Sequence, residues 1–303
     1  MVFISYLRMF FGPIRDVSQK YSIMQSAMAS AERIFLLLDS KEQEDYTTAG
    51  SKPPAVQGEI EFQQVSFAYR TGDSVLENIS FRVKAGETLA IVGVTGAGKT
   101  TMIHLLERFH QPQKGKILLD GQDIGRLDLG WLRTKVGLVM QDVFLFAGSL
   151  RENIVLDRDP SPQELERITR LSHLDDLISR LEDHLDAPIR ERGITISTGQ
   201  RQLLAIARAM AYDPRVLILD EATANIDSQT EFLIQQALDK LFEGRTTLVI
   251  AHRLSTIRKA DRILVLHHGR IVESGTHESL LARKDFYYRL HRLQFAEPAD
   301  HSS

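Results

Sequence analysis

The residues most able to do chemistry lie in a glycine-rich stretch, GVTGAGKT, that runs from Gly93 to Thr100. Gly93, Gly96 and Gly98 allow the backbone to turn tightly, so that consecutive N–H groups can point inward at a bound anion. Lys99 can place a positive charge on the outer phosphates of a nucleotide, and the Thr100 hydroxyl can reach a magnesium ion. The pattern therefore predicts a phosphate-binding loop.

The segments on either side of this loop fit the same reading. The apolar run Leu89–Val92 before it predicts a strand, and apolar residues follow it at helical spacing: Met102, Leu105, Leu106 and Phe109. A strand, a loop and a helix in this order place a phosphate at the N-terminus of the helix. The alternative is a chance match to a short pattern, and the two flanks argue against it.

Two adjacent carboxylates, Asp220 and Glu221, follow the apolar run Val216–Leu219. Ligands of open α/β sheets bind at the carboxyl ends of the strands, so we expect these acids to meet the nucleotide. Asp220 is placed to hold magnesium, and Glu221 is placed to orient or deprotonate the attacking water of a phosphoryl transfer. For an isolated Asp-Glu pair, a solvated strand end would be the preferred reading.

A second anion site is expected where ISTGQRQ, residues 196–202, precedes a helix with an apolar stripe. The stripe consists of Leu203, Leu204, Ala207 and Met210. Ser197 can cap this helix, whose start offers free N–H groups and the positive end of the helix dipole. Because the first loop already covers its own phosphates, we expect this site to serve a nucleotide held by another molecule. A well-capped helix without a ligand is the alternative.

Composition narrows the class of protein. The chain has 303 residues, 43% of them hydrophobic and 25% charged, which is ordinary for a globular protein with one large α/β domain and an appendage. A net charge of −3 does not favour nucleic acid as a partner, and the lack of cysteine excludes disulfides and thiolate chemistry. The most apolar window, residues 1–14, contains Arg8 and is shorter than the about 20 residues of a spanning helix. It also lacks the basic leader and cleavage site of a signal peptide.

The pattern along the chain predicts its organisation. Residues 14–38 carry an apolar stripe that predicts one long helix, which could form a coiled coil or dock on its own domain; the stripe consists of Ile14, Val17, Tyr21, Met24, Met28, Ala31, Phe35 and Leu38. Residues 40–57 are polar and are predicted to be a linker. Residues 59–67 and 76–83 predict antiparallel strands with a turn near Gly72. Three runs that are apolar on both faces, residues 89–92, 216–219 and 247–251, predict a buried parallel sheet, and residues 142–213 predict a helical subdomain.

Together these motifs resemble the nucleotide-binding domain of an exporter-type ABC transporter, of the multidrug and lipid half-transporter kind. The resemblance covers residues 57–295 and includes seven motifs in the family's order. They are Tyr69 in VSFAYR as the aromatic residue that stacks on adenine, GVTGAGKT as Walker A, Gln141 in VMQDVFLF as the Q-loop, ISTGQRQ as the signature, VLILDE as Walker B with its catalytic glutamate, ATANID as the D-loop, and His252 in IAHRLST as the switch histidine. Read alone, Tyr69 would be a core aromatic, His252 a structural histidine and Gln141 an ordinary loop residue.

The resemblance implies ATP and Mg²⁺ as cofactors and assigns residues to each task. Catalysis falls to Glu221, His252, Lys99 and Gln141; nucleotide binding to Tyr69, Gly93, Thr95, Gly96, Ala97, Gly98, Lys99, Thr100, Thr101, Ser197, Gly199 and Gln200; and magnesium binding to Thr100, Gln141 and Asp220. The signature departs from the usual LSGGQ at Ile196 and Thr198, and Arg190–Gly193 departs from the exporter segment GERG at its first residue.

The resemblance also implies an α/β fold with a P-loop NTPase core, a parallel central sheet, an antiparallel β subdomain and an inserted α-helical subdomain. Residues 1–55 would be the cytosolic end of the last transmembrane helix plus a connector, 56–296 the nucleotide-binding domain with a helical subdomain at about 142–213, and 297–303 a flexible tail.

The function so implied is that of an ATP-hydrolysing motor that dimerises head to tail around two Mg-ATP molecules and drives export across a membrane. Its partners would be a second nucleotide-binding domain, identical or related, and the transmembrane domain of the same full-length chain, at the cytoplasmic face of the cell membrane. The main alternative is a soluble ABC-type ATPase that acts on nucleic acid or ribosomes, for which a coiled-coil insertion or a basic stripe would be expected. A P-loop kinase of small molecules and a non-catalytic nucleotide sensor are weaker alternatives.

Overall fold

The computed structural model describes residues 2–39, 50–70, 72–140, 142–189, 196–220, 226–251 and 253–295. Three predicted site residues, Gln141, Glu221 and His252, lie outside the described residues, as do the segment Arg190–Gly193, the first part of the D-loop motif, most of the predicted linker and the predicted tail. The chain divides into two compact units, Met1–Thr47 and Thr48–Ser303.

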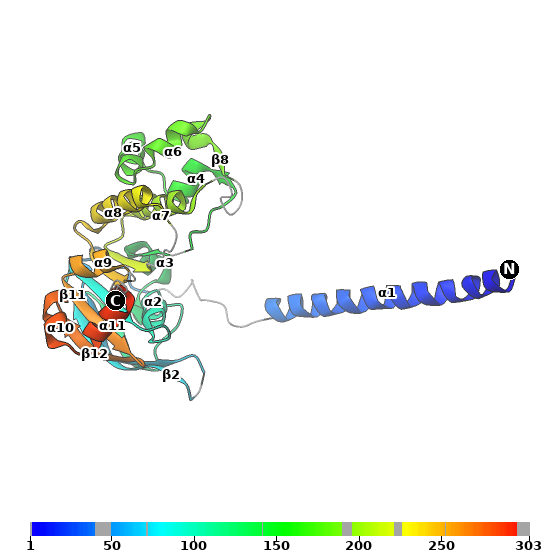
Figure 1. Ribbon diagram of the computed structural model, residues 1–303, viewed down its shortest axis with the longest axis horizontal. Coiled ribbons are helices and arrows are strands. Elements are labelled where there is room, and N and C mark those ends of the chain that lie inside the picture. Colours follow the sequence, from blue (N-terminus) through cyan, green and yellow to red (C-terminus); the bar gives the residue numbers. More distant parts are fainter. Residues whose placement is uncertain are drawn as a thin grey trace, which may run out of the picture. The chain divides into compact units, whose positions relative to one another are not determined.

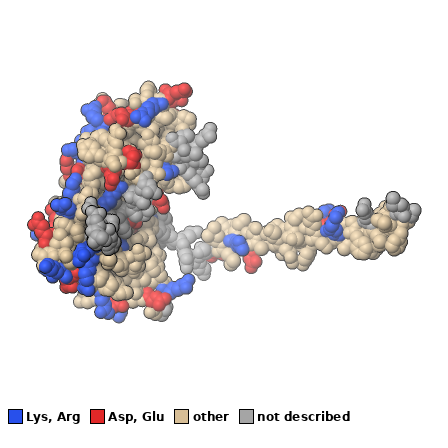
Figure 2. All heavy atoms as spheres, in the orientation of Figure 1, with Lys and Arg blue, Asp and Glu red and all other residues tan. Residues whose placement is uncertain are grey.

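In the first unit, residues 2–38 form one helix, α1 (Val2–Leu38). The helix predicted for residues 14–38 is therefore present, and it extends back to Val2 through Gly12 and Pro13, two residues that normally disfavour a helix interior. Its large apolar side chains are exposed, and Figure 2 shows a surface with few charged groups along it. Among the described residues, no helix combines the length and the apolar character needed to cross a membrane.

A six-stranded sheet forms the centre of the second unit, in the order β12-β11-β3-β10-β9-β6. The strands are β3 (Thr88–Gly93), β6 (Val136–Val139), β9 (Val216–Asp220), β10 (Thr246–Ile250), β11 (Arg262–His267) and β12 (Arg270–Gly275). All neighbours pair in parallel except β11 and β12. The three runs predicted to lie in a parallel sheet are β3, β10 and β9, which are adjacent, so this prediction is confirmed.

A four-stranded sheet, in the order β2-β1-β4-β5, lies against the first. Its strands are β1 (Ile60–Ala68), β2 (Ser74–Val83), β4 (Lys114–Leu119) and β5 (Gln122–Asp123), and β1 pairs antiparallel with β2 as predicted. Residues of both sheets share one apolar cluster with helix α2 (Lys99–Leu106), which follows the glycine-rich loop. This packing fixes α2 between the two sheets.

Helices make up most of the region between β6 and β9. They are α4 (Leu150–Val155), α5 (Pro162–Leu171), α6 (Asp175–Arg180) and α7 (Thr198–Tyr212), and α7 packs against α8 (Ser228–Phe242). Figure 1 shows this helical group at the opposite end of the unit from β12, α10 (His277–Arg283) and α11 (Phe286–Phe295). The predicted helical character of residues 142–213 is confirmed, but β7 (Gly148–Ser149) and β8 (Pro188–Ile189) were missed because strands of two residues carry no periodic signal. The remaining helices are α3 (Leu129–Lys135), α9 (Leu254–Lys259) and two short 3-10 turns, Ile124–Arg126 and His184–Asp186.

The prediction that Phe109 belongs to the apolar stripe of α2 is wrong. The helix ends at Leu106, and Arg108 adopts a left-handed φ of 54°, so the chain leaves the helix axis before Phe109. Phe109 is 46% exposed, whereas Met102, Leu105 and Leu106 are buried.

Candidate functional site

The glycine-rich loop joins β3 to α2 at the carboxyl edge of the parallel sheet. Gly98 has a φ of +103°, and a Cβ there would lie 2.6 Å from Leu76 Cδ2 and 3.0 Å from the Val75 carbonyl oxygen. A Cβ on Gly93 would lie 2.4 Å from the carbonyl oxygen of Leu266 on β11. Both positions therefore require glycine because a Cβ would not fit, and Gly98 also requires it for its positive φ. The loop is therefore held close to β2 and β11, while Thr95 and Gly96 in its middle are exposed.

Lys99, the first residue of α2, is bonded to the loop itself. Its Nζ donates to the carbonyl oxygens of Gly93 at 2.8 Å and Val94 at 3.1 Å, and the residue is buried. Burial lowers the pKa of Lys99, and the negative charge of Asp220 acts in the opposite direction. Because charge-assisted bonds to anionic oxygens are stronger than bonds to carbonyls, a bound phosphate would be a better partner for this ammonium group.

The other loop residues divide into exposed and buried groups. Thr95, Gly96 and Thr100 are exposed, whereas Ala97 and Thr101 are buried. The Thr100 hydroxyl is therefore open to solvent at the start of α2. Thr101, one position further, lies inside and contacts an aromatic side chain described below.

Asp220 ends β9, where it pairs with Ile250 at the end of β10. Its charge acts to raise the pKa of both Lys99 and His104, so the carboxylate lies near α2. A carboxylate and a hydroxyl are hard oxygen donors of the kind that Mg²⁺ prefers. Asp220 and Thr100 thus fit a magnesium ion by their chemistry, with Gln141, their expected companion, outside the described residues.

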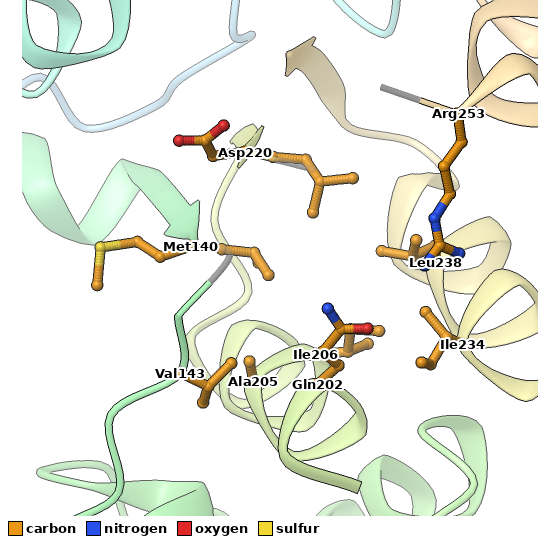
Figure 3. Close-up of a pocket in the computed structure, with 11 residues that line it drawn as sticks. Met140, Val143, Gln202, Ala205, Ile206, Asp220, Ile234, Leu238 and Arg253 are labelled. Atoms are coloured by element: carbon orange, nitrogen blue, oxygen red, sulfur yellow. The ribbon is translucent and has the colours of Figure 1, made fainter. Parts of the chain in front are cut away.

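A cavity lies beside Asp220, lined mainly by apolar side chains of β6, α7 and α8 (Figure 3). Its polar lining comes from Asp220, Gln202 and Arg253. Met140, Asp220 and Arg253, which all line it, are the sequence neighbours of Gln141, Glu221 and His252. The structure therefore brings together these three described neighbours, at the ends of β6, β9 and β10.

Tyr69 follows the last residue of β1 and is 51% exposed. Its hydroxyl lies 3.2 Å from Thr101 Oγ1 in the first turn of α2. The half-exposed ring is therefore next to the helix that begins at the glycine-rich loop. This place suits a base attached to a phosphate chain, because an aromatic ring stacks on any base.

The start of α7 has the capping expected from the sequence. Ser197 Oγ accepts from the backbone N–H of Gln200 at 3.2 Å, and Gln200 Oε1 accepts from the Ser197 N–H at 3.0 Å, which is a complete capping box. The predicted cap is confirmed, and the Gln200 side chain also takes part in it, a contact that was not predicted from the sequence.

Gly199 has a structural role that sequence reasoning missed. It is buried, and a Cβ there would lie 2.2 Å from Thr230 Cγ2 on α8. The close approach of this glycine is therefore made to α8 of the same chain. Ser197 and Thr198 beside it are exposed.

Two further residues near the site, His104 and His110, were not singled out from the sequence. His104 Nδ1 lies 3.4 Å from the Tyr69 hydroxyl, and the His110 ring packs on Tyr69. In the sequence, His104 is a polar residue outside the apolar stripe of α2. That position does not predict a contact with Tyr69.

Comparison with known proteins agrees with this geometry. A family model described as ABC transporter matches residues 76–224. The chain is 47% identical over 296 residues to an uncharacterized ABC transporter ATP-binding protein of Bacillus subtilis, YfiC, covering 97% of this chain and 49% of that protein. It is 46% identical over 295 residues to a probable multidrug resistance ABC transporter ATP-binding/permease protein of the same species, YheH, covering 96% and 43%.

The ATP-dependent lipid A-core flippase of Chromobacterium violaceum is 44% identical over 300 residues, covering 98% of this chain and 51% of the flippase. Among solved structures, a bacterial Atm1-family ABC exporter with ATP bound matches with a TM-score of 0.80 and 38% identity, covering 92% of this chain and 49% of the exporter. The chain thus spans about half the length of the curated relatives that it matches.

Fold and site together define a nucleotide-binding domain with a P-loop NTPase core, as predicted. The chain belongs to the ABC transporter family, and its second unit is the ATP-binding domain of the kind found in ABC exporters. The alternative of an ATPase that acts on nucleic acid or ribosomes is not favoured, since the matched proteins are transporters.

Proposed function

We propose that this domain hydrolyses ATP with the help of Mg²⁺ and acts as the motor of a membrane exporter. The observation that carries the proposal is that two polar groups of the described domain make their hydrogen bonds independently of each other. Tyr69 is hydrogen-bonded to Thr101 of α2, Lys99 at the start of α2 is hydrogen-bonded to Gly93 of the loop, and the charge of Asp220 acts on Lys99. The start of α7 makes its polar contacts within its own cap. A second copy could add its α7 start to the open side of the first group.

In the proposed complex, two domains meet head to tail and each nucleotide is held by both. One protomer contributes Tyr69, the loop from Gly93 to Thr101, Gln141, Asp220, Glu221 and His252, and its partner contributes the signature residues Ser197, Gly199 and Gln200. Because the γ-phosphate is contacted from both sides, the pair closes when ATP is bound and opens when the phosphate is lost.

The residues have distinct tasks in the proposed reaction. Thr100 and Asp220, with Gln141, would hold a magnesium ion, whose charge offsets that of the phosphates. Glu221 orients a water molecule toward the γ-phosphorus and accepts its proton. The bond from the γ-phosphorus to the bridging oxygen breaks, and ADP leaves with that oxygen. Lys99 and His252 stabilise the charge on the γ-phosphate oxygens.

The proposed membrane partner has a suitable docking surface in the second unit. A groove lies between α7, β6 and the segment after it, and it is lined by exposed apolar side chains that include Phe109, Met140, Phe144 and Phe146. Exposed apolar patches of this kind mark interaction sites. About half of the length of the matched relatives lies outside this chain, and one relative is named an ATP-binding/permease protein. We therefore assign this groove to the transmembrane part of the full-length protein, on the cytoplasmic side of the membrane.

The test of the proposed function is the substitution Glu221→Gln. Without a base, turnover should fall by orders of magnitude while ATP binding persists, so ATP-dependent dimers should accumulate. Phosphate release and light scattering measure the two effects, and Glu278→Gln, at an exposed carboxyl on α10, is the matched control. Unchanged turnover would show that Glu221 is not the base. A wild-type chain that binds ATP and releases no phosphate at any concentration would instead be a nucleotide sensor.

A further inference from the structure

Tyr69 is held by two other rings. The centroid of the Phe67 ring lies 4.9 Å from that of Tyr69 at 86°, and the centroid of the His110 ring lies 5.2 Å away at 87°. Phe67 and His110 are themselves 5.4 Å apart, so the three centroids form a nearly equilateral triangle. Both neighbours therefore lie to one side of Tyr69. Tyr69 is 51% exposed, so among the described residues its other side is open.

The Tyr69 hydroxyl is held separately from its ring. It lies 3.2 Å from Thr101 Oγ1 and 3.4 Å from His104 Nδ1, both on α2. Thr101 is 5% exposed and directly follows Thr100, so the hydroxyl is tied to the first turn of the phosphate-binding helix. The ring contacts and the hydroxyl contacts together fix both side-chain torsions of Tyr69.

His104 is suited to accept a hydrogen bond from the Tyr69 hydroxyl. Burial and the neighbouring His110 lower the pKa of His104, against the opposing charge of Asp220. A lowered pKa favours the neutral imidazole at neutral pH, which has one free acceptor nitrogen. Among the described residues, the rings of Phe109 and His110 also lie against His104, at 5.8 and 6.1 Å between centroids.

We propose that His110 and His104 are positioning residues for the base of the nucleotide, His110 by packing on the Tyr69 ring and His104 by holding its hydroxyl. This inference rests on the proposed function, since it requires that Tyr69 stack on adenine. A ring that is fixed before the ligand arrives loses less freedom on binding, and an edge-to-face pair is worth a measurable part of the affinity. Removing the His110 ring should therefore weaken binding of the nucleotide about three- to tenfold.

The experiment compares a ligand with a base and a ligand without one. Calorimetry on the full 303-residue chain gives the Kd of ADP and of inorganic pyrophosphate, neither of which is turned over by the ATPase reaction. His110→Ala should weaken ADP binding about three- to tenfold and leave the Kd of pyrophosphate unchanged. His110→Phe, which keeps a ring, should bind ADP as the wild type does. In a Tyr69→Ala background, His110→Ala should have no further effect, because the two residues act through one contact.

His104 is tested in the same way. His104→Leu removes the hydrogen-bond acceptor of the Tyr69 hydroxyl and should weaken ADP binding about two- to threefold. His104→Gln keeps an acceptor and should leave ADP binding unchanged. The loss should disappear in a Tyr69→Phe background, which lacks the hydroxyl. Equal losses for ADP and pyrophosphate would show a merely structural role, and unchanged ADP binding in His110→Ala and His104→Leu would overturn the inference while leaving the proposed function intact. A wild-type chain that binds pyrophosphate and ADP equally would refute Tyr69 as the base platform, and a chain that binds neither would refute the proposed function itself.

Discussion

Replacing Glu107 by glutamine should stabilise the protein more and more as the pH rises from about 4.5 to about 8. Glu107 follows the last residue of α2, is 4% exposed, and has an Oε1 atom without a hydrogen-bond partner among the described residues. Burial raises its pKa from 4.5 to about 8, while the positive charge of Arg133 acts in the opposite direction. The native state therefore keeps a proton on this carboxyl that the unfolded chain gives up.

The magnitude follows from the difference between the two pKa values. Below pH 4.5 the carboxyl is protonated in both the native and the unfolded state, so its ionisation does not change the free energy of unfolding. Between pH 4.5 and about 8 only the unfolded chain ionises, so the native state loses about 1.4 kcal/mol of stability for each pH unit. Above pH 8 the cost is constant at roughly 3–5 kcal/mol. Glutamine has nearly the same shape and does not ionise, so it carries none of this cost.

The assay is urea unfolding of the wild type and Glu107→Gln at several pH values from 5 to 9. The difference in free energy of unfolding should be small at pH 5 and should rise in favour of the variant until about pH 8. Glu182→Gln, at an exposed carboxyl, should show no such rise. A difference between wild type and Glu107→Gln that does not change with pH would show that the Glu107 carboxyl does not keep a raised pKa in the native state.

Three further substitutions test the residues that shape the glycine-rich loop and the start of α7. Gly98→Ala should abolish nucleotide binding and lower the melting temperature, because its Cβ would meet Leu76 at 2.6 Å in a left-handed conformation; binding at the wild-type Kd would contradict this. Gly199→Ala should destabilise the protein by roughly 1–3 kcal/mol through its overlap with Thr230 Cγ2, and adding Thr230→Ser, which removes that atom, should recover most of the loss in urea unfolding. If Thr230→Ser gives no recovery, the packing explanation is wrong. Ser197→Ala removes a cap worth about 1 kcal/mol, so hydrogen exchange should speed up in the first turn of α7, and unchanged exchange there would argue against the cap.

The sequence predicted the elements that have a strong local signal. The runs that became β3, β9 and β10 are apolar on both faces, and the glycine-rich loop has a fixed spacing, so both could be placed without a structure. The cap at Ser197 also has a local pattern, since its partner is only three residues away. Glu221, His252 and Gln141 remain predictions.

What the sequence did not reveal depends on contacts between distant residues. The need for glycine at position 199 comes from α8, and the rings around Tyr69 come from β1 and from the segment after α2. The raised pKa of Glu107 comes from burial, which periodicity alone does not show at a helix end. The early start of α1 was missed because Gly12 and Pro13 count against a helix interior in any local rule.

The claim on which the proposed function depends is that one copy of the domain is catalytically incomplete. The direct measurement is phosphate release per chain during stepwise dilution, with light scattering at each concentration to give the fraction of dimer. If two protomers are required, the rate per chain falls together with the dimer fraction. A constant rate in material that scatters as a monomer throughout would contradict it.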